Sequence, residues 1–239
     1  MTSEDILRTR IARIGKSSAR EFLAKFEILG NVGMGVWHWG LHLEGTLLSV
    51  ITFGTTCFGG RRGWIADVAA RHGLRVFQVC RGGTLPGARK GVPSRAMALS
   101  CRAMREHQGP FLAVAYADET LGEIGTIYQA AGAIYTGTTD PKGQADYIVN
   151  GRKRSAWQVR KRYGTRDRKA LKRIDPAVTV MPLRPKHRYL FIGAEGSKRR
   201  TILSSVQAYS RPYPKRSGLA FPVPFSYGHH MESEMSALS

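Results

Sequence analysis

The sequence predicts an α/β domain with a mixed central sheet flanked by helices and followed by a basic C-terminal extension. From Leu74 to Gly137 the order of patterns is strand, loop, helix, strand, helix, strand, which is typical of sheets with crossover helices. The chain has 239 residues, of which 42% are hydrophobic, and this is enough for one substantial core. We expect a catalytic core over residues 1–150, a basic extension packed on it over 151–203, and a partly disordered tail over 204–239.

In the first half, apolar residues recur at three- and four-residue spacings over the first thirty residues, which predicts a helix ending at Gly30. The runs GVWHWGLHL and TLLSVITFG are strand-like, and Glu44-Gly45 between them is typical of a short hairpin. A short helix is expected over 64–72. The alternating run LRVFQVC predicts a strand after it.

Further along the chain, a helix is predicted over residues 94–107, with Pro93 at its start, where proline is tolerated. The apolar run FLAVAYAD predicts a strand buried in a sheet. Helical character is expected over 120–133, followed by the short strand IYTG. YIVNGRKRS predicts a strand or hairpin arm, SAWQVRKRYGTRDRKALKR one or two basic helices interrupted at Gly164, and HRYLFIG a last apolar strand.

Charge is the most informative part of the composition. The chain has 37 Lys and Arg against 17 Asp and Glu, and residues 151–200 alone carry 17 basic and 3 acidic side chains. Such a local excess favours a polyanionic partner, and nucleic acid suits it better than a membrane because no lipidation motif or long amphipathic helix is present. We expect double-stranded DNA as the partner.

Several functional classes are disfavoured. Cys57, Cys80 and Cys101 are odd in number and form no CxxC pair, so buried thiols fit better than disulfides or a structural zinc site. No stretch approaches 18 apolar residues and the N-terminus lacks the order of a secretion signal, so we expect a cytoplasmic protein. His229-His230 is a possible metal tract, although a solvated pair is the commoner explanation at a chain end.

A basic, glycine-rich loop opens the helix after the LRVFQVC strand. It is neither a P-loop nor a GxGxxG fingerprint. Backbone N–H groups and a helix N-terminus at such a loop can bind a phosphate, so a phosphate-bearing donor is one interpretation and a merely flexible loop is the other. The candidate donor-binding residues are Arg81, Gly82, Gly83, Gly87, Arg89, Lys90, Gly91 and Ser94.

Two resemblances carry the argument further. The segment YADETLGEIGTIYQAAGAIYTG resembles the strand-helix-strand end of the GNAT acyltransferases, in which the glycine-rich loop holds the pyrophosphate of acyl-CoA. Together with VCRGG, PSR, YIVNGRKRS, RKRYGT and PKHRYLF, it resembles the phage DNA-modification proteins called Mom, over roughly residues 20–192. That family has a GNAT-like fold and adds a methylcarbamoyl (acetamido)-type group to the N6 amine of adenine in double-stranded DNA.

The resemblance implies functional roles for Arg81, Ser94, Asp118 and Tyr128. The family often has a His-Tyr pair near the end of the helix before the first hairpin, where this chain has Phe26-Glu27-Ile28. The role of that histidine is therefore absent here or supplied differently, and an iron requirement is neither indicated nor excluded. Glu27 could act as an acid or base, although a helix-surface carboxylate is the commoner explanation.

The chemistry of adenine suits these residue types. N6 is a poor nucleophile, so an enzyme must extrude the base, align it and accept a proton. Asp118 follows an apolar strand, where it could orient N6 or take its proton, or simply cap a turn. Tyr128 could protonate a leaving group or belong to the core, and Arg81 and Ser94 could bind a donor phosphate or carbonyl or stabilise the loop. Trp37, Trp39 and Trp64 are candidate stacking partners for an extruded base, with core packing as the alternative.

A run of cations supplies a track for DNA phosphates, with only Asp167 to neutralise it. The candidate nucleic-acid-binding residues are Arg152, Lys153, Arg154, Arg160, Lys161, Arg162, Arg166, Arg168 and Lys169, continued by Lys172 and Arg173. We expect an adenine-modifying transferase that protects phage DNA from restriction. The alternatives are a non-catalytic nucleic-acid-binding protein on a degenerate GNAT fold and an ordinary acyl-CoA transferase acting on a basic or RNA-bound substrate.

Overall fold

The chain forms two compact units. A computed structural model describes residues 3–27, 30–55, 63–119, 122–140, 145–154 and 156–215. The larger unit comprises Met1–Gly137 and His187–Ser239, and the smaller unit is Thr138–Lys186. The cations at 152–173 therefore lie in a unit inserted between two parts of the larger one, whereas the sequence suggested a C-terminal extension over 151–203. Residues 187–203 return to the larger unit because HRYLFIG is a strand of its sheet.

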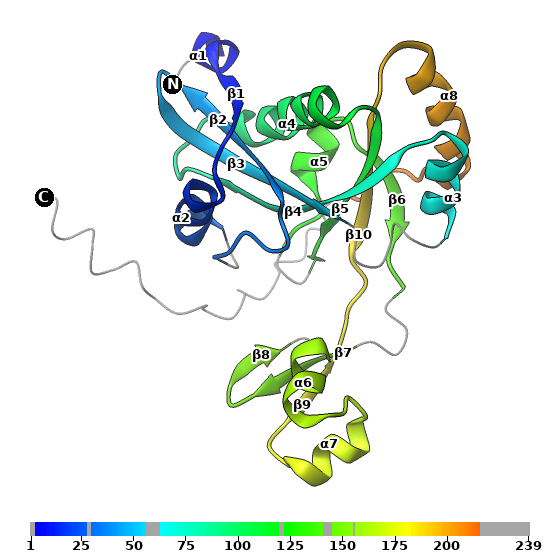
Figure 1. The fold of residues 1–239 in the computed structure, drawn as a ribbon. Helices are drawn as coiled ribbons and strands as arrows, with labels where there is room; N and C mark the ends of the chain where they lie inside the picture. Colours follow the sequence, from blue (N-terminus) through cyan, green and yellow to red (C-terminus); the bar gives the residue numbers. More distant parts are fainter. Residues whose placement is uncertain are drawn as a thin grey trace, which may run out of the picture. The chain divides into compact units, whose positions relative to one another are not determined.

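The larger unit has a seven-stranded sheet in the order β1-β2-β3-β4-β5-β10-β6 (Figure 1). The strands are β1 (Arg10–Arg13), β2 (Trp37–Leu43), β3 (Thr46–Thr55), β4 (Arg75–Thr84), β5 (Phe111–Ala117), β6 (Ile134–Thr138) and β10 (His187–Gly193). The ladder between β4 and β5 is parallel, whereas β1–β2, β2–β3, β3–β4 and β5–β10 are antiparallel. The predicted mixed sheet flanked by helices is thus confirmed.

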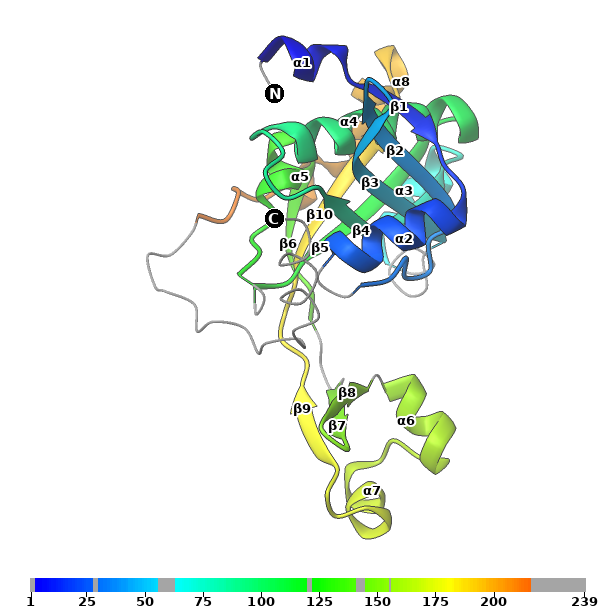
Figure 2. The same ribbon diagram turned by 90° about the vertical axis from the view of Figure 1, so that its left-hand side faces the viewer.

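Helices cover both faces of this sheet, as Figures 1 and 2 show. They are α1 (Ser3–Arg8), α2 (Lys16–Phe26), α3 (Trp64–Arg71), α4 (Val92–Gln108), α5 (Thr126–Ala130) and α8 (Gly196–Val206), with a 3-10 turn η2 (Gln207–Tyr209). One core joins α4 to side chains such as Phe53, Phe111 and Tyr189. On the other face, α3 and α8 pack on Leu112 and Leu190, and α2 packs on Val50. The alternation of side chains along each strand supplies both faces.

Two expected helices differ from the sequence-based prediction. The first thirty residues contain strand β1 between α1 and α2, and Ile11 in it pairs with Leu41 of β2. A helix expected over 120–133 is limited to Thr126–Ala130, because Gly122 and Gly125 before it have φ of 73° and 76°, which a right-handed helix cannot accommodate. The hairpin at Glu44-Gly45 is confirmed, with φ of 48° and 85° as a two-residue turn between strands requires.

The smaller unit has its own three-stranded sheet in the order β8-β7-β9 and two helices (Figure 1). The elements are β7 (Ala145–Val149), β8 (Arg152–Arg154), α6 (Ala156–Tyr163), α7 (Arg168–Ile174) and β9 (Thr179–Pro182). Asn150 and Gly151, with φ of 50° and 71°, turn β7 into β8. Val149, Val159 and Leu171 are among the buried residues of a separate small core. The tail after Lys215, including His229-His230, lies outside the described residues.

Candidate active site

The candidate site lies where the parallel ladder between β4 and β5 ends. The ladder between β4 and β5 runs from Arg75–Phe111 to Gln78–Val114. Beyond the end of this ladder, β4 remains paired with β3, and β5 remains paired with β10. A β-bulge shifts the register between β3 and β4, so that Thr52 lies opposite Arg81 while Phe53 lies opposite Val79. Ligand sites of open α/β sheets form at the carboxyl ends of strands, and bulges re-aim side chains there.

Arg81 forms a half-buried ion pair with Glu27. Its Nε lies 3.7 Å from Glu27 Oε1, and only 26% of the Arg81 side chain and 12% of the Glu27 side chain are exposed. Arg81 Nη1 donates to the Cys80 carbonyl at 2.6 Å. Its buried Nε has no hydrogen-bond partner among the described residues. Glu27 is thus no solvated helix-surface carboxylate, and its negative charge is balanced by the Arg81 guanidinium.

The GTIYQ turn that carries Tyr128 is held against Tyr189. The Tyr189 hydroxyl donates to the Ile124 carbonyl, and Gln129 Nε2 donates to that carbonyl at 3.1 Å and to the Tyr189 hydroxyl at 3.0 Å. A Cβ on Gly125 would lie 2.6 Å from Tyr189 Cζ, so the ring can approach only a glycine. The Tyr128 ring packs against Tyr189 and Phe191, with centroids 5.5 and 6.1 Å apart. Tyr128 is thereby oriented from two sides.

Burial raises the pKa of the Tyr128 phenol well above its usual value, and Glu123 and Glu27 add to the shift while Arg81 opposes it. The charges of Arg81 and Glu27 therefore lie within electrostatic reach of the Tyr128 phenol. A tyrosine phenol is protonated at neutral pH, and the raised pKa holds this proton more firmly. Tyr128 is therefore a hydrogen-bond donor at neutral pH, and it can give up its proton only to a strongly basic atom.

The raised pKa of Tyr128 predicts a pH dependence of stability. A tyrosine in the unfolded chain ionises near pH 10, whereas the folded phenol holds its proton longer. The folded state therefore binds more protons above about pH 10, and its free energy of unfolding falls as the pH rises further. We expect Tyr128→Phe to fall less steeply than wild type in denaturant titrations above this pH. Equal slopes for the two proteins would contradict the raised pKa.

Asp118 directly follows β5 and is half-buried. Its carbonyl accepts the backbone N–H of Glu123 at 3.3 Å, which joins it to the turn leading to α5. Ser94 lies in the first turn of α4, and its hydroxyl donates to the Gly91 carbonyl at 3.0 Å. Asp118 therefore lies at the start of the turn that leads to α5 and Tyr128. The described hydrogen bond of Ser94 is instead to Gly91, the residue that precedes α4.

The glycines of the expected loop have two different roles. Gly82 and Gly83 belong to β4 and pair with Ile51 and Val50. A Cβ on Gly83 would lie 3.0 Å from Leu23 Cδ2 and 3.2 Å from the Phe26 carbonyl, so this glycine allows α2 to approach.

The loop itself begins at Leu85. Gly87 and Gly91 have φ of 74° and 101°, with nothing within 4 Å of a Cβ at either. No side chain caps α4, and Arg89 and Lys90 precede it. Positive-φ glycines, two cations and an uncapped helix start fit a phosphate-bearing group. The part of the loop suited to such a group is therefore Leu85–Ser94.

Sequence reasoning missed a titratable group close to Asp118. His187, 7% exposed, lies opposite Ala117 in the β5–β10 ladder. Its Nδ1 is 3.0 Å from the Tyr135 hydroxyl, and its Nε2, 3.9 Å from Glu119 Oε2, is buried with no hydrogen-bond partner in the part of the chain described. The available signal was a histidine opening an otherwise apolar strand.

The candidate stacking tryptophans pack inside the larger unit. Trp39 is buried and Trp37 packs edge-on against Phe77, with ring centroids 5.0 Å apart. The Trp64 ring is stacked on Tyr209 at 4.0 Å, with the Arg188 guanidinium 5.7 Å from it. These contacts correspond to the core-packing alternative.

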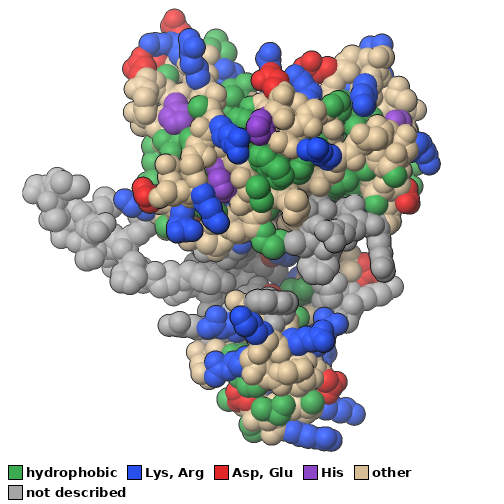
Figure 3. Space-filling view, in the orientation of Figure 1, with side chains coloured by type: hydrophobic (Ala, Val, Ile, Leu, Met, Phe, Trp, Pro, Cys, Tyr) green, Lys and Arg blue, Asp and Glu red, His purple; other side chains and the backbone are tan. Residues whose placement is uncertain are grey.

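The candidate nucleic-acid-binding residues are all in the smaller unit. Arg152 and Lys153 belong to β8, Arg154 is half-buried, and the cations of α6 and α7 are exposed. Asp167, the acidic residue among them, caps α7 by accepting the Ala170 N–H at 2.8 Å. Figure 3 shows Lys and Arg side chains on several parts of the visible surface of this unit.

Comparison with known protein families shows to which family the chain is related. The Mom protein family model matches residues 8–215, which is most of the chain. The chain belongs to the Mom protein family. The resemblance of its motifs to that family is thereby confirmed. No curated protein sequence matches this Mom-family chain.

Solved structures similar to the chain are acetyltransferases of low identity. A polyamine N-acetyltransferase from Drosophila melanogaster is 10% identical, with 77% of this chain and 99% of that chain covered and a TM-score of 0.43. A Bacillus subtilis acetyltransferase in complex with CoA is 8% identical, with 77% and 97% covered and a TM-score of 0.40. A GNAT-family acetyltransferase from Bacillus anthracis is 12% identical, with 79% and 96% covered and a TM-score of 0.40.

The described part of the chain lacks two features. No helix in it has the length and apolarity needed to cross a bilayer. No group of three or more His, Cys, Asp or Glu side chains in the same residues is arranged to hold a metal ion.

Proposed function

We propose that this chain transfers a methylcarbamoyl (acetamido)-type group to the N6 amine of adenine in double-stranded DNA, protecting phage DNA from restriction. The observation that carries the proposal is membership of the Mom family over residues 8–215, a range that includes Arg81, Ser94, Asp118 and Tyr128. The proposal is supported by the electrostatic contact between Arg81 and Tyr128. Glu27 holds Arg81, and Tyr189 packs against Tyr128.

Asp118, Arg81 and Tyr128 have different roles in the proposed group transfer. Asp118 accepts or orients the N6 proton as the nitrogen bonds to the transferred carbon, which offsets the low nucleophilicity of an amine conjugated with the ring. The positive charge of the Arg81 guanidinium, oriented by Glu27 and by the Cys80 carbonyl, stabilises negative charge on an oxygen of the transferred group. Tyr128, whose phenol is protonated at neutral pH, donates a hydrogen bond to the leaving group and passes its proton to it as negative charge develops there.

The donor is a phosphate-bearing, acyl-CoA-like molecule in this proposal. When bound it supplies the activated group. The segment Leu85–Ser94 would hold its phosphate through the backbone N–H groups at the mouth of α4, with Arg89 and Lys90 adding charge. An iron requirement stays open.

The smaller unit binds the DNA backbone. Residues 138–186 contain fourteen Lys and Arg against four Asp and Glu, so about half of the net charge of +20 belongs to about a fifth of the chain. Phosphate contacts of this kind provide affinity and position without reading sequence.

The decisive experiment is mass spectrometry of nucleosides from cells that express the protein. We expect a modified deoxyadenosine whose added mass identifies the transferred group, and none in cells that carry an empty vector. Duplex binding without any modified base would favour the non-catalytic nucleic-acid-binding alternative.

The salt dependence of DNA binding tests the role of the smaller unit. If Arg168, Lys169 and Arg173 on α7 contact phosphates, changing them to Ala should flatten the fall of log affinity with log salt by roughly 0.9 for each phosphate that is no longer neutralised. The matched control changes three exposed cations of the larger unit, Lys25, Arg71 and Lys198. Fluorescence anisotropy with a short duplex measures both slopes. An equal effect of the two triple variants would contradict a track on α7.

A further inference from the structure

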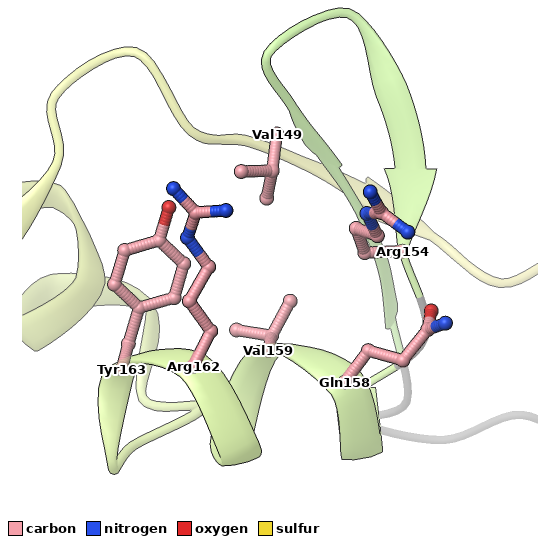
Figure 4. Close-up of a pocket in the computed structure, with 6 residues that line it drawn as sticks. All are labelled: Val149, Arg154, Gln158, Val159, Arg162 and Tyr163. Atoms are coloured by element: carbon pink, nitrogen blue, oxygen red, sulfur yellow. The ribbon is translucent and has the colours of Figure 1, made fainter.

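The smaller unit contains a cavity of about 160 Å³ between α6 and the β7–β8 hairpin. Figure 4 shows six side chains around it: Val149 from β7, Arg154 from β8, and Gln158, Val159, Arg162 and Tyr163 from α6. Val149 and Val159 are buried, so the cavity has an apolar wall, and its remaining lining is polar or positively charged. Small-molecule sites usually span about 300–1,000 Å³, so this cavity suits a single chemical group.

Two guanidinium groups line this cavity and no carboxylate does. Arg154 and Arg162 have no ion-pair partner among the residues described. Tyr163, which lines the cavity, donates its hydroxyl hydrogen to Asp175 Oδ2 at 2.8 Å. The Arg162 guanidinium lies 5.4 Å from the centroid of the Tyr163 ring, a cation–π contact that restrains it. Two like charges on one cavity repel each other, and a bound anion relieves this repulsion.

Phosphate is the anion that this lining fits best. Each guanidinium presents a planar fork of N–H donors that matches two oxygens of a phosphate group. Arg154 and Arg162 come from different elements, so together they can contact one tetrahedral group from two sides.

The surroundings favour a phosphate that belongs to a polymer. Arg160 and Lys161 are exposed on the same helix as Arg162. A free phosphate would use the cavity alone, whereas successive phosphates of duplex DNA would also reach these neighbours.

We propose that Arg154 and Arg162 form a clamp for one backbone phosphate of duplex DNA, which fixes the register of the DNA on the smaller unit. This inference rests on the proposed function, since it assumes a DNA substrate. It adds that two arginines bind through bidentate hydrogen bonds, while the other cations contribute mainly charge.

The test replaces both arginines by lysine in the full-length chain, which keeps the net charge and removes the planar forks. We expect Arg154→Lys/Arg162→Lys to bind a short duplex about tenfold more weakly than wild type, because bidentate charge-assisted hydrogen bonds can no longer form. The matched control, Arg20→Lys/Arg71→Lys, makes the same change at two exposed arginines of the larger unit and should stay within about twofold, because the net charge is unchanged. Melting temperatures of all three proteins establish that they are folded.

Four other results would each contradict the proposed phosphate clamp, and they can be told apart. Equal affinities for the two lysine variants would mean that only charge matters. A wild-type protein that modifies adenine in cells, with a cavity variant that binds as tightly as wild type, would overturn the clamp and leave the proposed function intact. No duplex binding by wild type would overturn both. Thermal stabilisation by inorganic phosphate that disappears in the cavity variant, with unchanged duplex affinity, would assign the cavity to free phosphate instead.

Discussion

Asp118→Asn and Tyr128→Phe are each expected to lower the rate of adenine modification by roughly 10²- to 10⁴-fold. Both changes keep the size and shape of the side chain and remove its acid–base function. Phe at 128 retains the ring packing on Tyr189 and Phe191, so folding should be little affected. The rate is measured by nucleoside mass spectrometry at equal amounts of folded protein.

DNA affinity provides the internal control for these two variants. The proposed phosphate contacts belong to the smaller unit, whereas Asp118 and Tyr128 belong to the larger one, so affinity should barely change. If the two residues only cap a turn or fill the core, stability should fall by about 0.5–2 kcal/mol while activity per folded molecule stays near wild type. Full modification by both variants would remove them from the mechanism.

Gly125→Ala is expected to be strongly destabilising. The new Cβ would lie 2.6 Å from Tyr189 Cζ, and the residue has φ of 76°. Overpacking costs about 1–3 kcal/mol and the left-handed backbone about 1–2 kcal/mol, so we expect a loss of about 2–5 kcal/mol. The same displacement of Tyr189 should misplace Tyr128, so activity should fall in the protein that remains folded.

Gly132→Ala separates the two contributions. Gly132 has φ of 77°, but nothing lies within 4 Å of a Cβ there. It should therefore lose only the backbone part, about 1–2 kcal/mol. Denaturant titration of both variants gives the difference, and equal losses would show that the contact with Tyr189 contributes nothing.

Elements with a strong local signal could be predicted from the sequence. The strands β2, β3, β5 and β10 have apolar runs, and the turn between β2 and β3 has residues suited to positive φ. The pattern fails where pairing over a distance overrides it. The apolar residues in Arg10–Arg13 continue a helical spacing. This segment nevertheless forms strand β1, because it pairs with β2. β9 and α8 lack a clear local pattern, so the sequence does not predict them.

The site shows the same division. Motif resemblance proposed Arg81 and Tyr128 as site residues, because each lies in a short local motif. It did not show that Glu27 is buried against Arg81, that Gly125 admits the Tyr189 ring, or that His187 lies opposite Ala117. Each of these facts joins residues from separate elements, and no local spacing encodes them.

Composition and local pattern were therefore sufficient to predict the mixed α/β class and the concentration of positive charge, and motif resemblance to a known family indicated the Mom relationship. The folded chain was needed to show that the cations at 152–173 belong to an inserted unit, because the chain re-enters the larger sheet at His187. It was also needed to show which charges are neutralised and which are not. Burial and partner geometry set the Tyr128 pKa and leave Arg154 and Arg162 facing one cavity, and both depend on contacts formed only when the chain folds.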